Sequence, residues 1–580
     1  MSAILRGIPA TRGVVVGTGL VYDLTPPFFE KEHISPDRVE YEWDRLQKAL
    51  QEAIGEVTQL RDQVEQKLGK EQAAIFDAHL LILDDEALLD LSRQHIEQDL
   101  MGAEWALWES TEEFVQILAD LENEYFQARA TDIHDIRTRV LYHLQGRQTP
   151  QLRYLSEPVI VIARDLLPSD TAGLDAAVVL GIVTEEGGPT SHTAILARQM
   201  GIPAVVGVKG LLEQVRADES AALMIALDAR SGEIVLNPEP EIVQRYTAAA
   251  SVYKDQQQQL EALRTVPAIT PDGVSLELAA NIGRPRDAMP AVEAGASGVG
   301  LFRTEFLFLD RDAVPSEAEQ LQAYSDVLRA FADKPVIVRT LDIGGDKHIS
   351  YLSLPEENNP FLGLRGIRLC LDSEYQPLFR TQLRALLQAA QQTAGNLWIM
   401  FPMICDLREL RQAKAFLVEV EQELLQEGKL TQAVSPAIKQ GIMLETPAAV
   451  WLIDQLAKEA DFFSIGTNDL AQYTLASDRM NARLGELHRP FHPAVMRAIA
   501  HAVRSANEHQ RWIGMCGELA GDPRVSAFLL GLGIQELSME PKSLNAVKQV
   551  IRQTSSQQAR ELVEQVLNAE NSAEIEQLLR

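Results

Sequence analysis

The sequence predicts a multidomain α/β protein that ends in a (β/α)8 barrel. Short apolar runs alternate with longer helical patterns from about residue 265 to the C-terminus. An amphipathic helical pattern fills residues 36–145, and strand-like runs lie on both sides of it. A chain of 580 residues also exceeds the size at which one hydrophobic core is usual.

The first part of the chain predicts a mixed α/β domain interrupted by helices. Residues 5–22 mix β-branched residues with glycine and predict one or two strands. Further strands are predicted at residues 158–162, 176–183, 203–208, 223–227 and 233–236, with one short helix at about 191–200. The simplest topology pairs these strands with residues 5–22, so that one domain comprises residues 1–35 and 146–240.

The helices of residues 36–145 form the second predicted domain. Apolar residues recur at steps of three and four from Leu46 to Leu68, which is typical of a long amphipathic helix. Similar patterns at 73–94, 103–127 and 132–145 predict a helical bundle or a pair of helical hairpins. The polar residues 241–264 predict a linker helix before the barrel.

The barrel is predicted over residues 265–580. Its eight strands are expected at residues 276–282, 298–308, 335–343, 397–404, 441–445, 462–466, 513–516 and 534–539. Active sites of such barrels lie at the carboxyl ends of the strands. Those ends carry Arg303, Arg339, Asp342, Glu445, Asn468, Asp469 and Cys516, a set of polar groups that packing alone explains poorly.

Composition excludes several classes of function. The formal net charge is −30, and an acidic surface repels phosphate backbones, so we expect no nucleic-acid partner. The three cysteines show no CxxC spacing, which indicates neither a disulfide framework nor a zinc site. No signal peptide and no membrane-spanning run is found. We therefore predict a cytoplasmic protein without membrane insertion.

Residues 181–207 (GIVTEEGGPTSHTAILARQMGIPAVVG) place a histidine in the first turn of a short helix. A strand ends at 187–188, Thr190 or Ser191 can cap a helix that begins near His192, and Gly201 ends it. Free backbone N–H groups there favour an anion. A neutral imidazole can act as a nucleophile toward a phosphoryl group. A packed or capping histidine remains the alternative from these residues alone.

The segment GGPTSHTAILAR resembles the phosphohistidine signature of enzymes that use phosphoenolpyruvate. Three families share it: enzyme I of the bacterial sugar phosphotransferase system, pyruvate phosphate dikinase and phosphoenolpyruvate synthase. The motifs RTEFLF, VRTLDIGGDK, ENNPFLGLR, ETPAA, FFSIGTNDL and MCGELAGD resemble enzyme I in order, and the likeness covers essentially the whole chain.

The resemblance implies a phosphoenolpyruvate-protein phosphotransferase that needs Mg2+. Phosphoenolpyruvate carries a phosphate and a carboxylate, which call for forked cationic donors and a divalent cation. By resemblance, Glu445 and Asp469 bind the magnesium, and Cys516 is the acid that protonates the enolate carbon. By the same resemblance, the substrate is held by Arg303, Arg339, Asn468, Asp469 and Arg479, with Arg365 as a further arginine. Arg368 lies in the same segment as Arg365.

The resemblance also implies partners. His192 would receive the phosphoryl group and pass it to a histidine of the phosphocarrier protein HPr, as the first step of sugar uptake. The helical domain resembles the HPr-binding domain, with His79, Glu86 and Arg129 as candidate contacts, and a homodimer through the barrel is expected.

Three other functions fit the sequence less well. A dikinase or synthase needs a large nucleotide-binding domain before the phosphohistidine motif, and only 191 residues precede His192. A catalytically idle scaffold would not need His192, Glu445, Asp469, Arg303, Arg339 and Cys516. A lyase or mutase confined to the barrel leaves the His192 domain without a role.

Overall fold

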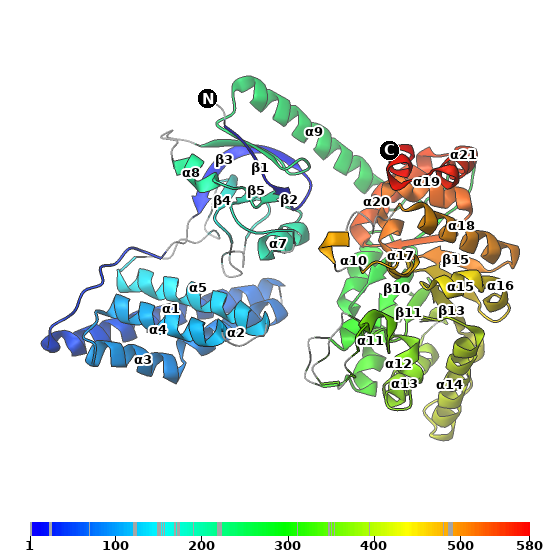
Figure 1. The fold of residues 1–580 in the computed structure, drawn as a ribbon, viewed down its shortest axis with the longest axis horizontal. Helices are drawn as coiled ribbons and strands as arrows, with labels where there is room; N and C mark the ends of the chain where they lie inside the picture. The colour runs from blue at the N-terminus through cyan, green and yellow to red at the C-terminus, as the bar shows by residue number, and fades with distance from the viewer. Residues whose placement is uncertain are drawn as a thin grey trace. The chain divides into compact units, whose positions relative to one another are not determined.

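The computed structural model describes most of the chain, and it falls into two compact units, Met1–Gln256 and Gln257–Arg580 (Figure 1). Residues not described are 1–2, 23–25, 69, 120–123, 148–151, 153–154, 156, 167–169, 171–173, 190, 217–222, 310, 312, 346–348, 350, 353, 356, 394, 479–480 and 485–490. Within helices, the side chains of 66–68, 70–72, 74, 117–119, 124–131, 192, 199, 216 and 482 are also not described. The multidomain α/β class with a terminal barrel is confirmed.

The first unit contains a mixed sheet of eight strands in the order β1-β8-β7-β3-β4-β5-β6-β2. The strands are β1 (Ala3–Arg6), β2 (Ile8–Pro9), β3 (Val14–Tyr22), β4 (Val159–Ala163), β5 (Val179–Thr184), β6 (Ala204–Val206), β7 (Met224–Asp228) and β8 (Glu233–Leu236). Strands from both sides of the helical segment therefore share one sheet. Residues 5–22 contribute to three strands, one more than expected.

Alternate residues of the central strands supply two hydrophobic layers, because successive strand side chains point to opposite faces. Val161, Ile182 and Val206 pack with the helix α7 (His192–Met200). On the other face, Ile160, Val183 and Val205 belong to a cluster with Leu211 and Leu212 of α8 (Leu211–Arg216), a helix that the sequence analysis missed. Tyr246 of α9 (Pro240–Ala262) packs against a third cluster with Val14, Ala226 and Val235.

The helical segment consists of α1 (Val39–Leu68), α2 (Lys70–Leu83), α3 (Glu86–Glu97), α4 (Ala103–Ala119) and α5 (Glu124–Leu144). The predicted stripe of α1 is buried at Leu46, Leu50, Ala53, Val57, Leu60 and Val64. The pattern at 73–94 is divided between α2 and α3, because the Asp85 carboxylate accepts from the amides of Ala87 (2.9 Å) and Leu88 (3.2 Å) and starts a new helix.

The second unit is a closed barrel of eight parallel strands, β9 to β16 in chain order around the ring. The strands are β9 (Glu277–Ile282), β10 (Val299–Arg303), β11 (Val336–Arg339), β12 (Leu397–Phe401), β13 (Lys439–Leu444), β14 (Phe462–Ile465), β15 (Trp512–Met515) and β16 (Glu536–Met539). All eight predicted strands are present. The strand predicted at 298–308 is shorter than expected. It ends at Arg303, and residues Thr304–Leu307 form a 3-10 helix.

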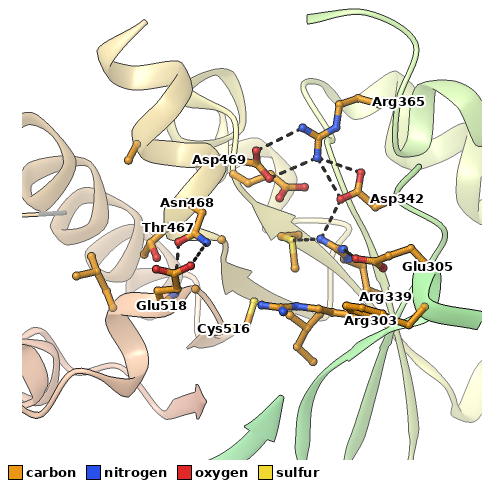
Figure 2. A pocket seen from close by; sticks show the side chains of 18 of the residues that line it. Arg303, Glu305, Arg339, Asp342, Arg365, Thr467, Asn468, Asp469, Cys516 and Glu518 are labelled. Carbon is orange, nitrogen blue, oxygen red and sulfur yellow. Dashed lines mark hydrogen bonds and ion pairs between the residues drawn. The ribbon is translucent and has the colours of Figure 1, made fainter. Parts of the chain in front are cut away.

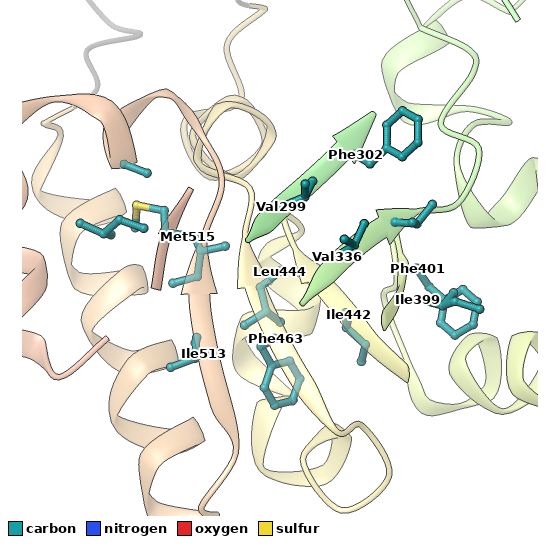
Figure 3. Close-up of a cluster of buried hydrophobic side chains, with 14 of the residues drawn as sticks. Val299, Phe302, Val336, Ile399, Phe401, Ile442, Leu444, Phe463, Ile513 and Met515 are labelled. Atoms are coloured by element: carbon teal, nitrogen blue, oxygen red, sulfur yellow. The ribbon is translucent and has the colours of Figure 1, made fainter. Parts of the chain in front are cut away.

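Helices cover the outside of the barrel. The helices longer than one turn are α10 (Ala288–Glu293), α11 (Glu317–Phe331), α12 (Ile367–Leu371), α13 (Gln376–Gln391), α14 (Leu407–Gln426), α15 (Pro447–Trp451), α17 (Thr467–Leu475), α18 (Pro493–Glu508), α19 (Pro523–Leu532), α20 (Leu544–Gln553), α21 (Ser556–Asn568) and α22 (Ser572–Leu578). Outward-facing side chains such as Phe302, Ile399 and Phe463 pack in this layer (Figure 3). None of the helices in the described part of the chain is long and apolar enough to cross a membrane.

A buried ion pair connects α5 to α1. Arg139 is 3% exposed and lies 2.6 Å from Glu56 and 3.2 Å from Asp135. Burial alone would lower the pKa of Arg139, but the carboxylates of Asp135 and Glu56 raise it above the ordinary value. The guanidinium therefore stays charged inside the protein, and its removal leaves two carboxylates buried without their cation.

We expect Arg139→Met to destabilise α5 by about 3–5 kcal/mol, because breaking a buried pair from one side leaves an uncompensated charge. Lys48→Met is the control, since Lys48 is exposed and lies 4.0 Å from Glu52, and it should change stability by about 0–1 kcal/mol. Hydrogen exchange of the α5 amides in the full chain gives the opening free energy. Similar losses in the two variants would contradict this assignment.

Candidate active site at the barrel mouth

A cavity of about 750 Å³ lies at the carboxyl ends of the barrel strands. Predicted residues from five strand ends or the loops after them line it: Arg303, Arg339, Asp342, Arg365, Glu445, Asn468, Asp469 and Cys516. Figure 2 labels all of them except Glu445. Arg368 points elsewhere and donates to the Leu362 carbonyl oxygen at 3.1 Å. Arg479 lies outside the described residues. The volume suits a small anion rather than a polymer.

The barrel topology explains why these residues meet. Arg303 and Arg339 are the last residues of β10 and β11, and Glu445 directly follows β13. Asp469 is in the first turn of α17, and Cys516 directly follows β15. Parallel strands of a closed barrel end at the same rim, so residues more than two hundred positions apart in the sequence share one cavity.

Arg339 is held by two carboxylates. Its Nη2 donates to Glu305 Oε1 at 2.5 Å, and its Nη1 lies 3.0 Å from Asp342 Oδ2. Both acids are buried, and Arg339 is only 6% exposed. Glu305, two positions after Arg303, thus pairs with an arginine of the next strand. Arg303 is half-buried in the cavity wall.

Arg365 bridges two acids from different segments, Asp342 in the loop after β11 and Asp469 in α17. Its Nη2 donates to both Asp342 oxygens at 3.1 Å, and its Nη1 donates to Asp469 Oδ1 at 3.3 Å. Gly344 makes this approach possible, because a Cβ there would lie 2.7 Å from Arg365 Cβ and the backbone has φ +105°. The arginine joins β11, its following loop and α17 into one network at the cavity wall (Figure 2).

Glu445 is an acid of the cavity whose pKa is strongly raised. Burial, together with the nearby carboxylates of Asp469 and Asp342, raises its pKa to about 8. Its Oε1 accepts a hydrogen bond from the Met403 amide at 2.6 Å, and Met403 adopts φ +58°. A carboxyl that is neutral near pH 7 can release its proton when a cation arrives, so Glu445 can act as a ligand.

Cys516 is a buried thiol at the inner wall. Its Sγ lies 3.8 Å from the Ile465 carbonyl oxygen, and burial raises its pKa to about 11. The thiol therefore remains protonated at neutral pH. Such a group is a poor nucleophile but can donate a proton to a carbanion beside it.

Three acids that line the cavity were not predicted as functional: Glu305, Glu518 and Asp522. Glu305 is described above, and Glu518 accepts from Asn468 Nδ2 at 3.1 Å. A signal for Glu305 and Glu518 was present, because each follows a predicted site residue by two positions, Arg303 and Cys516 respectively. Side-chain pairing across neighbouring strands could not be read from that spacing.

The predicted histidine helix of the first unit begins and ends as expected. Helix α7 starts at His192, the Ser191 hydroxyl caps it by accepting from the Ala194 amide at 3.3 Å, and Gly201 ends it with φ 69°. Thr193 anchors the first turn by donating to Asp165 Oδ1 at 2.9 Å. The His192 imidazole lies outside the described side chains. Its backbone position at a helix N-terminus suits an anion.

The candidate docking contacts of the helical segment need one correction. His79 is 1% exposed, and its ring nitrogens lie 3.3 Å from Asp132 and 3.8 Å from Asp135. It sits inside the bundle because its helical face is the apolar one, so it cannot meet a partner. Glu86 is exposed, and the Arg129 side chain lies outside the described set.

Three family models match the chain. The descriptions are PEP-utilising enzyme, N-terminal, over residues 6–129; PEP-utilising enzyme, mobile domain, over 155–232; and PEP-utilising enzyme, PEP-binding domain, over 257–556. The cavity described above lies within the third match.

Curated relatives match over nearly their whole length. A protein of Geobacillus stearothermophilus named phosphoenolpyruvate-protein phosphotransferase is 44% identical over 571 residues, 98% of this chain and 96% of its own. A protein of the same name from Staphylococcus carnosus (strain TM300) is 43% identical over 580 residues, 100% of this chain and 99% of its own. A third, from Bacillus subtilis (strain 168), is 43% identical over 571 residues, 98% of each chain.

Glu445 gives the barrel a stability that depends on pH. Its pKa is about 8 in the folded chain and 4.5 ordinarily, so between these values the folded chain holds a proton that the unfolded chain has lost. The stabilisation by the neutral form is complete below pH 4.5 and is lost as pH rises through about 8. Without divalent cations, we expect the free energy of unfolding to fall by a few kcal/mol over this window.

Urea denaturation of the full chain at several pH values measures this fall. Glu445→Gln keeps the side chain neutral at every pH, so this variant should lose most of the pH-dependent fall in the free energy of unfolding. The same pH dependence in the natural protein and in Glu445→Gln would show that another group is responsible.

Proposed function

The chain belongs to the PEP-utilising enzymes and is a member of the phosphoenolpyruvate-protein phosphotransferase family, and from this premise we propose that His192 receives the phosphoryl group of phosphoenolpyruvate. The resemblance drawn from the sequence motifs is thereby confirmed. The observation that carries the proposal is the cavity at the barrel mouth, where buried arginines and acids from separate strands face one small space. Pyruvate is the second product.

The cavity suits a small substrate with two anionic ends. We assign Arg303, Arg339 and Asn468 to phosphoenolpyruvate, with Arg365 and Arg479 as further cations. Guanidinium groups match phosphate and carboxylate through forked donors. Arg339 is fixed by Glu305 and Asp342 before any substrate arrives, so little rearrangement is needed at the moment of reaction.

Glu445 and Asp469 have the chemistry to hold Mg2+. Both offer carboxylate oxygens, which this cation prefers, and Mg2+ is usually bound by one or two carboxylates together with substrate phosphate oxygens. No group of three or more His, Cys, Asp or Glu side chains gathers as a metal site within the described residues. In the proposed Mg2+ site, the protein supplies these two carboxylates and the substrate supplies further oxygen ligands. When bound, the ion neutralises negative charge on the phosphoryl oxygens.

The residues then act in sequence. The arginines orient the phosphoryl group, and His192 attacks the phosphorus as the bond to the enolate oxygen breaks. Cys516 gives its proton to the enolate carbon, and pyruvate forms. His192 and the cavity lie in different compact units, so the reaction requires the two to meet.

We propose a histidine of the phosphocarrier protein HPr as the acceptor, in the first step of sugar uptake. The helices α1 to α5 are its docking region in this proposal, and the acidic chain favours a partner with a basic face. A homodimer through the barrel stays a prediction. All three cysteines are free thiols, which suits the cytoplasm that we propose as the location.

We expect His192→Ala to abolish labelling by phosphoenolpyruvate that carries labelled phosphate, because the acceptor nitrogen is gone. The natural protein, with Mg2+, should gain an acid-labile, base-stable label and release pyruvate. His33→Ala, which changes an exposed histidine, should label normally. Addition of HPr should remove the label from the natural protein. Equal labelling of the natural protein and His192→Ala would contradict the assignment.

We expect Asp469→Asn to raise the Mg2+ concentration needed for half-maximal pyruvate release by about tenfold or more, roughly 1.4 kcal/mol of binding, because one anionic ligand is lost. Asp333→Asn changes an exposed aspartate of a turn and serves as the control. Titration of pyruvate release with Mg2+ measures the effect. An unchanged requirement would remove Asp469 from the ligand set.

A further inference from the structure

A side chain from another strand of the barrel holds the backbone of Cys516. Asn281 lies near the end of β9, and its Nδ2 donates to the Cys516 carbonyl oxygen at 3.0 Å. In the ring of strands, β16 lies between β9 and β15. The amide therefore reaches past one strand and joins Cys516 to a part of the barrel that is not its neighbour in the sheet.

The sheet itself leaves this carbonyl group without a partner on β16. The ladder between β15 and β16 ends at the pair of Met515 with Leu537, one residue before Cys516. On the other side, the Cys516 amide donates to the Ile465 carbonyl oxygen of β14 at 3.1 Å. A buried backbone carbonyl requires a donor. One side of the Cys516 backbone is thus held by the neighbouring strand, and the other side is held by Asn281.

The Asn281 amide is itself oriented by a hydroxyl group. A carbonyl oxygen only accepts, so the amide nitrogen must face Cys516. The Ser538 hydroxyl of β16 donates to Asn281 Oδ1 at 2.6 Å. Ser538 is fully buried and fits because β10 has a glycine beside it, where a Cβ on Gly300 would lie 2.5 Å from Ser538 Oγ. Residues of four strands therefore fix the direction of the Cys516 carbonyl group.

The position of the Cys516 sulfur depends on this backbone support. Its contact with the Ile465 carbonyl oxygen is long, at 3.8 Å. The thiol also belongs to an apolar cluster with Leu301, Met400 and Phe462. Apolar neighbours limit the space around the sulfur but do not fix the direction of the S–H bond. A displacement of the Cys516 backbone is therefore passed on to the thiol.

We propose that Asn281 is a positioning residue for the proton transfer from Cys516, and that it fixes which face of the enolate receives the proton. The inference rests on the proposed function. In that transfer the S–H bond breaks, a C–H bond forms on the enolate carbon, and the electron pair stays on sulfur. Water later returns a proton to the thiolate. In the described part of the chain, Asn281 is not among the residues that line the cavity, so it acts through the Cys516 backbone.

A misplaced proton donor has a characteristic effect on the product. A donor works within hydrogen-bond distance of the accepting atom, and a misplacement of about 1 Å can slow a positioned step by roughly 100-fold. The phosphoryl group would still reach His192, because that transfer does not use the thiol. The enolate would then last long enough for water to protonate it on either face. Loss of stereochemistry, rather than loss of activity, is the expected sign.

The configuration of the methyl group of the product measures this effect. The protein, in excess and with Mg2+, converts phosphoenolpyruvate that carries deuterium at one defined C3 position, in tritiated water and in a single turnover. Lactate dehydrogenase and NADH trap the pyruvate as lactate, which prevents its return to the site. A methyl group with hydrogen, deuterium and tritium is chiral. Its configurational excess shows whether the proton arrived on one face.

We expect Asn281→Asp to lower the configurational excess by about twofold or more, because slower donation lets water compete. The carboxylate keeps the shape of the amide but presents an acceptor to the Cys516 carbonyl oxygen. Asn281→Ala and Ser538→Ala should lower the excess as well. Cys516→Ala sets the value expected when the donor is missing.

Asn396→Ala is the matched control. Asn396 is 6% exposed, and its amide donates to the carbonyl oxygens of Leu328 and Lys334 at 3.1 Å each. It directly precedes β12, so it lies at the amino ends of the strands, away from the cavity. This variant also loses a buried amide that supports the backbone, and it should keep the configurational excess of the natural protein.

An unchanged excess in Asn281→Asp would overturn the inference. An equal loss in Asn396→Ala would overturn it too, because a general loosening of the barrel would then explain the effect. If Asn281→Asp does not fold, an unchanged excess in Ser538→Ala decides against the inference instead. A racemic product from the natural protein, or a full excess in Cys516→Ala, contradicts the role of Cys516. Absence of pyruvate contradicts the proposed function itself, so the failures are distinguishable.

Discussion

The structure of the barrel mouth depends on charges kept away from water. Moving an ion into the protein interior is unfavourable unless opposite charges and hydrogen bonds surround it. Arg339 and Arg365 are both less than a tenth exposed, and Asp342 contacts the two of them. Each group is stable only because the others are in place. The network therefore fixes the geometry of the site before a ligand is present.

The same environment divides the acids of the site into two kinds. Glu305 and Asp342 face guanidinium groups and serve as counter-ions for the arginines. Glu445 and Glu536 are buried where carboxylates are among their neighbours, and both favour the neutral form. The carboxyl group thus supplies both anchoring anions and neutral acids within one barrel, and the difference arises from what lies around each side chain.

Sequence patterns predicted the strands and the residues at their ends, because the alternation of apolar runs and helices reflects burial directly. Arg303, Arg339, Glu445, Asp469 and Cys516 line one cavity as the barrel topology requires. Patterns could not reveal partners in space. The pairing of Glu305 with Arg339 and the burial of His79 depend on tertiary neighbours. The burial of Glu536 in β16 was not predicted either, because room for its carboxyl group depends on the distant Gly300, where a Cβ would lie 1.9 Å from Glu536 Oε1.

The burial of Cys516 has a consequence for chemical durability. Peroxides and alkylating reagents attack the thiolate form of cysteine, and they need access to sulfur. Cys516 is 1% exposed and strongly favours its thiol form, so both its burial and its protonation protect the sulfur from these reagents. A catalytic cysteine that serves as a nucleophile must be ionised, which leaves it open to oxidation. In the proton-donating role proposed for Cys516, the thiol need not be ionised at rest, so the site avoids that vulnerability.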